Sequence, residues 1–97
     1  MSPLPHDWFM RVRLKLRHLQ LFIALDDLRN LHRAAERLGM SQPAASKLLG
    51  ELEGQLGLAL FERHRSGMLC TTAGKIVLHR FRRALQQLIE AETALAR

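Results

Sequence analysis

Cysteine and aromatic residues are scarce in this chain, and the scarcity of cysteine excludes two kinds of site. The 97 residues contain one cysteine, Cys70, so an internal disulfide and a cysteine-rich zinc site are both excluded. Aromatic residues make up only 5% of the chain, yet hydrophobic residues reach 47%, with leucine and alanine dominant, which favours helices. No apolar run approaches the roughly 18 residues that a membrane span needs. These counts predict one small helical domain with an appendage, in which Cys70 is a buried thiol.

Acidic residues are also in the minority. Nine Asp and Glu stand against 15 Lys and Arg, which gives a formal net charge of +6. An excess of this size suits a polyanionic partner, either nucleic acid or an anionic membrane. Basic residues at Arg11, Arg13, Lys15 and Arg17 interrupt the N-terminal region, so it has no apolar segment of a secretory signal. We therefore expect a cytoplasmic protein.

The order of predicted elements begins with an extension, residues 1–15. The run MRVRLKL within it alternates apolar and basic residues, which is strand periodicity. It predicts either a loosely ordered arm or edge strand, or a basic arm that reaches DNA phosphates. From Leu16 the period becomes helical, with a predicted inward stripe that ends before Asn30; its members are Leu16, Leu19, Phe22, Ile23 and Asp26.

Residues 30–49, NLHRAAERLGMSQPAASKLL, predict two short helices that meet at Gly39. Asn30 is an expected N-cap for a helix over 32–38, and Ser41 for a helix over 42–56 that Gly57 ends. Pro43 fits the first turn of the latter, where a missing N–H costs nothing. The outward positions of this helix are hydrogen-bonding side chains, none of them acidic: Gln42, Ser46 and Lys47. This pattern predicts a helix-turn-helix whose second helix suits the DNA major groove.

A β-hairpin and a long helix complete the predicted fold. Strand candidates at 60–63 and 68–71 flank a basic turn over 64–67, which indicates a wing beside the helix-turn-helix. Thr71 or Thr72 is then expected to cap a helix that runs to Arg97, about 37 Å at 1.5 Å per residue. Its apolar stripe resembles a coiled-coil seam, and it predicts either packing on its own domain or pairing with a second copy; its members are Leu78, Phe81, Leu85, Leu88 and Leu95.

Several of these blocks, in order and with matching spacing, resemble LysR-type transcriptional regulators. They are LRHLQLFIAL, RAAERL, SQPAASKLLGELEGQLGLALFER and TTAGK. The resemblance implies a mainly α, winged helix-turn-helix domain over 16–71 and a dimerising linker helix over 72–97. It also implies an effector-binding domain that is absent from this chain, and a tetrameric full-length parent. One departure is His32, which stands where the family often has a small hydroxyl residue against the phosphate backbone.

The resemblance also implies which side chains face double-stranded DNA. Gln42, Pro43, Ser46 and Lys47 would lie in the major groove, with Gln42 suited to adenine and Pro43 to a thymine methyl. Ser41 and Arg33 would bond phosphates. On the wing, Arg63 and Arg65 are expected at phosphates or in the minor groove, although Arg63 could instead pair with Glu62 or Glu53. A homodimer on an inverted-repeat operator follows from the same resemblance.

Catalysis and metal binding find no support in the sequence. The histidines are scattered without a metal-ligand pattern, and no glycine-rich loop suits a phosphate cofactor. We predict no enzyme activity and no cofactor. A winged-helix module that binds protein rather than DNA is the main alternative, and a membrane-surface role of the basic arm is the third.

Overall fold

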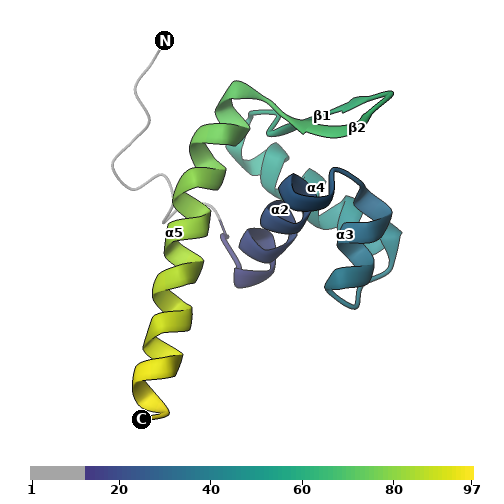
Figure 1. The fold of residues 1–97 in the computed structure, drawn as a ribbon. Helices are drawn as coiled ribbons and strands as arrows, with labels where there is room; N and C mark the ends of the chain where they lie inside the picture. The colour runs from purple at the N-terminus through teal and green to yellow at the C-terminus, as the bar shows by residue number, and fades with distance from the viewer. Residues whose placement is uncertain (1–12) are drawn as a thin grey trace.

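The computed structural model describes residues 13–97 and confirms the mainly α, winged helix-turn-helix fold (Figure 1). The helices are α2 (Leu16–Leu28), α3 (Leu31–Arg37), α4 (Gln42–Leu56) and α5 (Thr72–Leu95), and the strands are β1 (Phe61–His64) and β2 (Gly67–Cys70). Most of the predicted N-terminal extension, residues 1–12, lies outside the described residues. Within the described part of the MRVRLKL run, Arg13 is in a turn and Leu16 already begins α2, so no strand forms there.

Helix α2 is the centre of the domain, because α3, α4, α5 and β2 all pack against it. Its most deeply buried apolar side chains are Leu21, Phe22, Ala24 and Leu25. The stripe predicted for this helix is therefore only partly correct: Leu19 and Phe22 are buried, but Leu16 is 49% exposed and Ile23 and Asp26 are half-buried. A helix covered on several sides buries more than one stripe, so a single periodic face describes it poorly.

The helix-turn-helix forms as predicted from its capping residues. Asn30 Oδ1 accepts the Arg33 N–H at 2.9 Å, which caps α3, and Ser41 Oγ accepts the Ala44 N–H at 3.2 Å, which caps α4. Gly39, in the turn between them, has φ +67°. The inward face of α4 consists of Ala45, Leu48, Leu49, Leu52 and Leu56, and Gly57 ends the helix at φ +67°. The opposite face of α4 is left to solvent.

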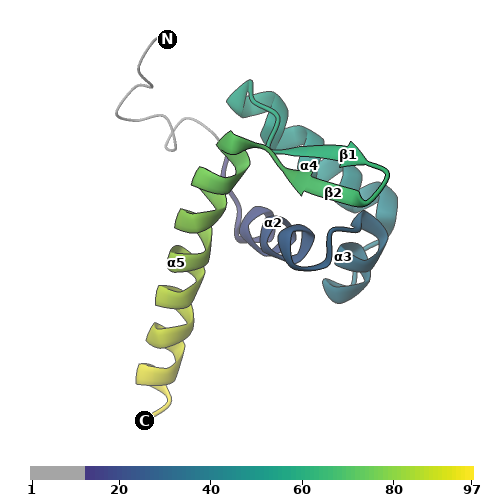
Figure 2. The same cartoon turned by 45° about the horizontal axis from the view of Figure 1, so that its top comes forward.

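The two strands form an antiparallel hairpin that is joined directly to the helix-turn-helix (Figure 2). Both are shifted slightly from the predicted ranges, and residues 65–66 make the turn. The N–H of Met68 donates to the carbonyl oxygen of Arg29 at 2.9 Å. Gly67 has φ +119°, and a Cβ there would clash with the same carbonyl oxygen, so only glycine allows this close approach. The wing is thus fixed to the corner between α2 and α3.

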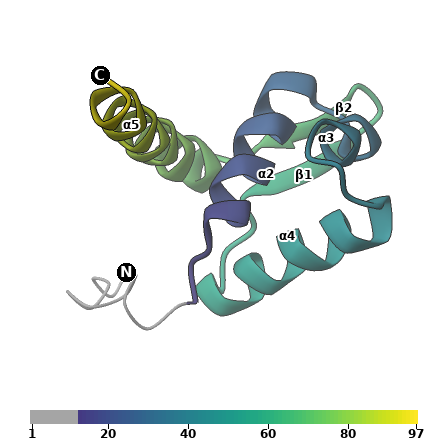
Figure 3. The ribbon, with the colours of Figure 1, turned by 90° about the horizontal axis from the view of Figure 1, so that it is seen from below.

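Helix α5 is divided between the domain and solvent. Leu78 and Phe81 are only 3% and 4% exposed, and the Phe81 ring stacks on Phe22 with centroids 5.8 Å apart. Beyond them the helix leaves the domain on the side away from α3 (Figure 3), and Leu88 and Leu95 are 54% and 87% exposed. The stripe predicted as one dimer seam is therefore corrected: Leu78 and Phe81 are occupied by the domain's own core, while the half-buried Leu85 marks the point where the helix emerges.

Candidate functional site

The side chains predicted to face DNA on α4 are all exposed and lie at its N-terminal end. Gln42, Pro43, Ser46 and Lys47 belong to the face opposite the buried Ala45 and Leu48. Because α4 packs its apolar face on the domain, this polar face is held outward in one orientation. Two flanking residues were also predicted as phosphate contacts, Ser41 and Arg33. Both are exposed, and their capping bonds leave the Ser41 hydroxyl proton and the Arg33 guanidinium available.

The wing carries Arg63 and Arg65 at different places. Arg65 is in the turn at the tip of the hairpin, whereas Arg63 pairs with Met68 across the two strands. Directly opposed residues project to the same face of a sheet, and Met68 is buried. Arg63 therefore lies on the face of the wing that looks toward the domain. The sequence did not indicate on which side of the wing Arg63 lies.

The alternative that Arg63 pairs with a glutamate is not found among the described residues. Glu62 lies 3.4 Å from His64, and Glu53 accepts the backbone N–H groups of Leu60 and Phe61 at 2.6 and 3.2 Å. Both carboxylates are thus engaged elsewhere. Within residues 13–97 no carboxylate lies within ion-pair distance of the Arg63 guanidinium.

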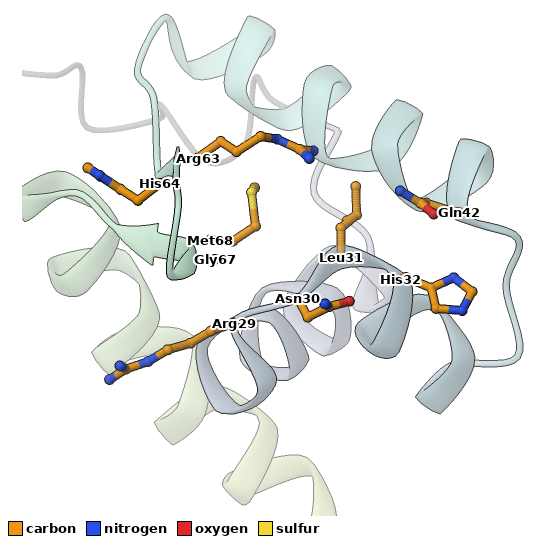
Figure 4. Close-up of a pocket in the computed structure, with 9 residues that line it drawn as sticks. All are labelled: Arg29, Asn30, Leu31, His32, Gln42, Arg63, His64, Gly67 and Met68. Atoms are coloured by element: carbon orange, nitrogen blue, oxygen red, sulfur yellow. The ribbon is translucent and has the colours of Figure 1, made fainter.

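A pocket of about 240 Å³ lies between the wing, the α2–α3 corner and the start of α4 (Figure 4). We call it the wing-corner pocket; it is lined by Arg29, Asn30, Leu31, His32, Gln42, Arg63, His64, Gly67 and Met68. The Arg63 guanidinium and the Gln42 amide point toward each other across Leu31, and the His32 ring lies beside Gln42, as Figure 4 shows. The Arg29 and His64 side chains point away from them. No acidic side chain lines the pocket.

Two features of this region escaped sequence reasoning. Arg29 adopts a left-handed backbone conformation, φ 54°, at the end of α2, and its carbonyl oxygen anchors the wing. Glycine or asparagine usually marks such a position, so an arginine gives no local signal. The sequence offered Glu53 only as an alternative partner of Arg63, but Glu53 ties the end of α4 to the start of β1.

A second charged cluster joins α2, α3 and α5 away from this surface. Arg82 donates to Asp26 at 2.6 Å and to Asp27 at 2.8 Å, and Asp27 also accepts from Arg37 at 3.0 Å. The hydrogen bond from Arg82 is the main reason why the pKa of Asp27 lies below its usual value. Nearby, burial and then the charge of Asp26 raise the pKa of the half-buried Cys70 thiol to about 11, so the thiolate is disfavoured.

Neither a metal site nor a membrane span emerges from the part of the chain that the structure describes. Over residues 13–97, no three His, Cys, Asp or Glu side chains gather closely enough to hold a metal ion. None of the helices described is long and apolar enough to cross a membrane.

Comparison with known sequences places the helix-turn-helix and the wing in one family. The family described as "Bacterial regulatory helix-turn-helix protein, lysR family" matches residues 16–75. The HTH-type transcriptional regulator GbpR of Azospirillum brasilense is 59% identical over 87 residues, which cover 90% of this chain and 25% of that protein. The HTH-type transcriptional regulator XapR of Escherichia coli strain K12 is 44% identical over 85 residues, covering 88% and 28%. The chain thus spans about a quarter of the length of these relatives.

Solved structures with the same fold include complexes with DNA. The crystal structure of the CbnR DBD–DNA complex superposes with a TM-score of 0.73 at 36% sequence identity and covers 87% of this chain and 100% of that one. The BenM DBD/benA site 1 DNA complex gives a TM-score of 0.79 at 26% identity and covers 86% and 96%. The crystal structure of CbnR, described as a LysR family transcriptional regulator, gives a TM-score of 0.78 at 34% identity, with 86% of this chain and 29% of that one covered.

Proposed function

This chain belongs to the lysR family of bacterial regulatory helix-turn-helix proteins, and from that membership we propose that it binds a specific double-stranded DNA sequence to regulate transcription. Residues 16–71 would be the DNA-binding domain and 72–97 a linker helix. The relatives are named as transcriptional regulators, which indicates a non-enzymatic role. A cytoplasmic location is part of the same proposal.

The observation that supports this proposal most strongly is the polar face of α4. Gln42, Ser46 and Lys47 are exposed in the first two turns of α4, where no residue is acidic, and the packing of Ala45 and Leu48 sets their direction. An amide such as that of Gln42 can offer a donor and an acceptor together to adenine. Lys47, Arg33 and Arg65 supply exposed cations around it, suited to phosphates.

A selection experiment tests the proposal directly. The 97-residue chain is mixed with a pool of random duplexes, and the bound fraction is enriched and sequenced. We expect one preferred sequence motif. We also expect the logarithm of the association constant to fall by about 0.9 for each tenfold rise in salt concentration and each phosphate contact. A protein-interaction module would enrich no motif.

Gln42→Ala tests the base-reading role within that experiment. We expect it to weaken binding to the selected duplex by about 1–3 kcal/mol and to leave binding to a scrambled duplex nearly unchanged. Gln55→Ala, which changes an exposed glutamine in the last turn of the same helix, is the matched control and should change neither. Equal losses on both duplexes would show that Gln42 does not read a base.

We further propose that two copies pair through the exposed part of α5 and meet an inverted-repeat operator, with a tetramer as the assembly of the full-length protein. Leu88, Ile89 and Leu95 are 54%, 46% and 87% exposed, and Leu85 lies half-buried on the same helix. Each fully buried side chain of this kind contributes about 1.5–3 kcal/mol, so pairing would remove an unfavourable surface from water. A two-fold protein matches a two-fold operator.

Analytical ultracentrifugation of Leu88→Asp tests the dimer. The variant should sediment as a monomer and bind the selected duplex much more weakly, because bivalence is lost. Ile76→Asp places the same charge on a 66% exposed position of the domain-bound half of α5 and should remain dimeric. An unmutated chain that is monomeric at high micromolar concentration would contradict the dimer while leaving DNA binding open to its own test.

A further inference from the structure

We propose that the wing-corner pocket binds one phosphate of the DNA backbone and that His32 takes up a proton when it does. This inference rests on the proposed DNA binding and identifies the chemical group that occupies the pocket. The pocket lies beside Gln42, at the first turn of the proposed recognition helix, and is built from three separate parts of the fold. A phosphodiester carries a single negative charge and acceptor oxygens, which the polar lining of this pocket can bind.

The first contribution is the fixed cation Arg63. Its place opposite Met68 directs it to the domain side of the wing, and Figure 4 shows its guanidinium extending toward Gln42. The Met68–Arg29 hydrogen bond and the close packing at Gly67 hold the wing over the corner. A guanidinium without a carboxylate partner in the described residues is free to form a charge-assisted bond with phosphate.

The second contribution is the titratable His32. Its Nε2 lies 2.7 Å from Glu36 Oε1, one turn along α3, and both side chains are well exposed, 63% and 65%. If Nε2–H donates to Glu36, the other ring nitrogen, Nδ1, carries a hydrogen only when the imidazole is protonated. A neutral ring would then present a lone pair to a phosphate oxygen, which repels it, whereas an imidazolium presents a second N–H donor. Phosphate binding therefore favours the protonated ring.

The charges around His32 are favourable for this role. Among residues 13–97, the carboxylate in contact with His32 is that of Glu36, and this contact fixes the orientation of the ring. Glu62, on the wing, is held by His64 instead, whose side chain points away from the pocket. The Arg29 side chain also points away. The remaining groups that face the pocket or flank His32, from α3, the α2–α3 corner, α4 and the wing, are cationic or neutral: Arg33, Asn30, Gln42 and Arg63.

The affinity of the chain for its selected duplex, measured by fluorescence anisotropy at fixed ionic strength, is therefore expected to depend on pH. It should rise about threefold to tenfold between pH 8 and pH 6, the range in which histidine changes charge. His32→Gln should bind with an affinity that no longer changes with pH. His79→Gln, which alters an exposed histidine of α5 far from this pocket, should keep the dependence of the unmutated chain.

Duplexes with one neutral methylphosphonate at a time locate the phosphate. At one position per half-site, the substitution should weaken binding of the unmutated chain and remove its pH dependence. The same substitution should have little effect on His32→Gln. Arg63→Gln should bind more weakly at every pH and should lose most of its sensitivity to that same position. Circular dichroism at each pH confirms that all variants remain folded.

Three results would overturn the inference. They are a pH dependence that persists in His32→Gln, one that is lost in His64→Gln instead, and the lack of any single methylphosphonate position that removes it. Inorganic phosphate at matched ionic strength is a separate arm. If it abolishes the pH dependence of the unmutated chain at low concentration, the pocket takes a free anion and the assignment to DNA is wrong. If the unmutated chain binds no duplex at any pH, that result would instead contradict the proposed function.

Discussion

Replacement of Glu53 by alanine should destabilise the domain strongly, although this side chain is only half-buried. Glu53 Oε2 accepts the N–H groups of Leu60 and Phe61 at 2.6 and 3.2 Å, and both of these residues are buried. Hydrogen bonds to a charged group contribute about 1.5–3 kcal/mol each. Because the two bonds share one oxygen in a half-buried site, we take the lower limit for each and expect a loss of about 3 kcal/mol. The total free energy of unfolding of a domain of this size is about 5–15 kcal/mol, so this loss would be a large fraction of it.

Urea denaturation followed by circular dichroism measures this loss as a shift of the midpoint at constant slope. Glu53→Gln keeps an acceptor oxygen but removes the charge, so it should lose about half as much. Glu51→Ala changes an exposed glutamate of the same helix and should remain within about 0.5 kcal/mol of the unmutated chain. If Glu53→Ala is as stable as Glu51→Ala, the link between α4 and β1 has no energetic importance and the reasoning fails.

Two further predictions concern stability. Burial, supplemented by the charge of Lys15 and opposed by Glu51, lowers the pKa of His18 below its usual 6.5, so the unfolded chain binds the proton more readily. The free energy of unfolding, measured by urea denaturation, should therefore be constant above pH 6.5 and decline as the pH falls below 6.5. The free energy of unfolding of His18→Gln should decline less over the same pH values. The glutamine amide can accept the Lys15 N–H that His18 Nδ1 accepts at 2.8 Å, so this bond can be kept. Gly74→Ala should cost about 2–3 kcal/mol by thermal denaturation, because its Cβ would clash with the Leu60 carbonyl oxygen. Gly54→Ala, in open space on α4, should instead add about 0.5–1 kcal/mol, and similar effects of the two changes would refute the packing argument.

Local signals in the sequence were sufficient for the helix-turn-helix. Asn30 and Ser41 cap their helices and Gly57 ends α4 where the pattern predicts, because caps depend on residues only three or four positions apart. The bounds of α4 follow from these signals alone. The exposed face of that helix was equally predictable, because its buried stripe defines the opposite side.

Long-range contacts could not be predicted in the same way. A carboxylate in the last turn of a helix is unfavourable by the helix dipole, and only the folded structure shows that Glu53 is compensated by two N–H groups beyond the helix. Periodicity identified Leu78, Phe81 and Leu88 as one apolar stripe, but it could not show which surface covers each part. Similarly, the side of the wing on which Arg63 lies follows from its position opposite the buried Met68, and the predicted strand ranges did not show that Met68 packs against the domain.

The division of α5 makes the helix a lever with a fixed root and a free arm. Its root is held by Leu78 and Phe81 in the core and by Arg82 at the two aspartates of α2. From residue 82 to the end at Leu95 the arm is about 20 Å long at 1.5 Å per residue. A tilt of about 10° at the root would move the end of the arm by about 3.5 Å, which is close to the rise of one base pair. In a dimer joined through this arm, packing at the root would therefore set the operator spacing that the protein accepts, to within a single step of the double helix.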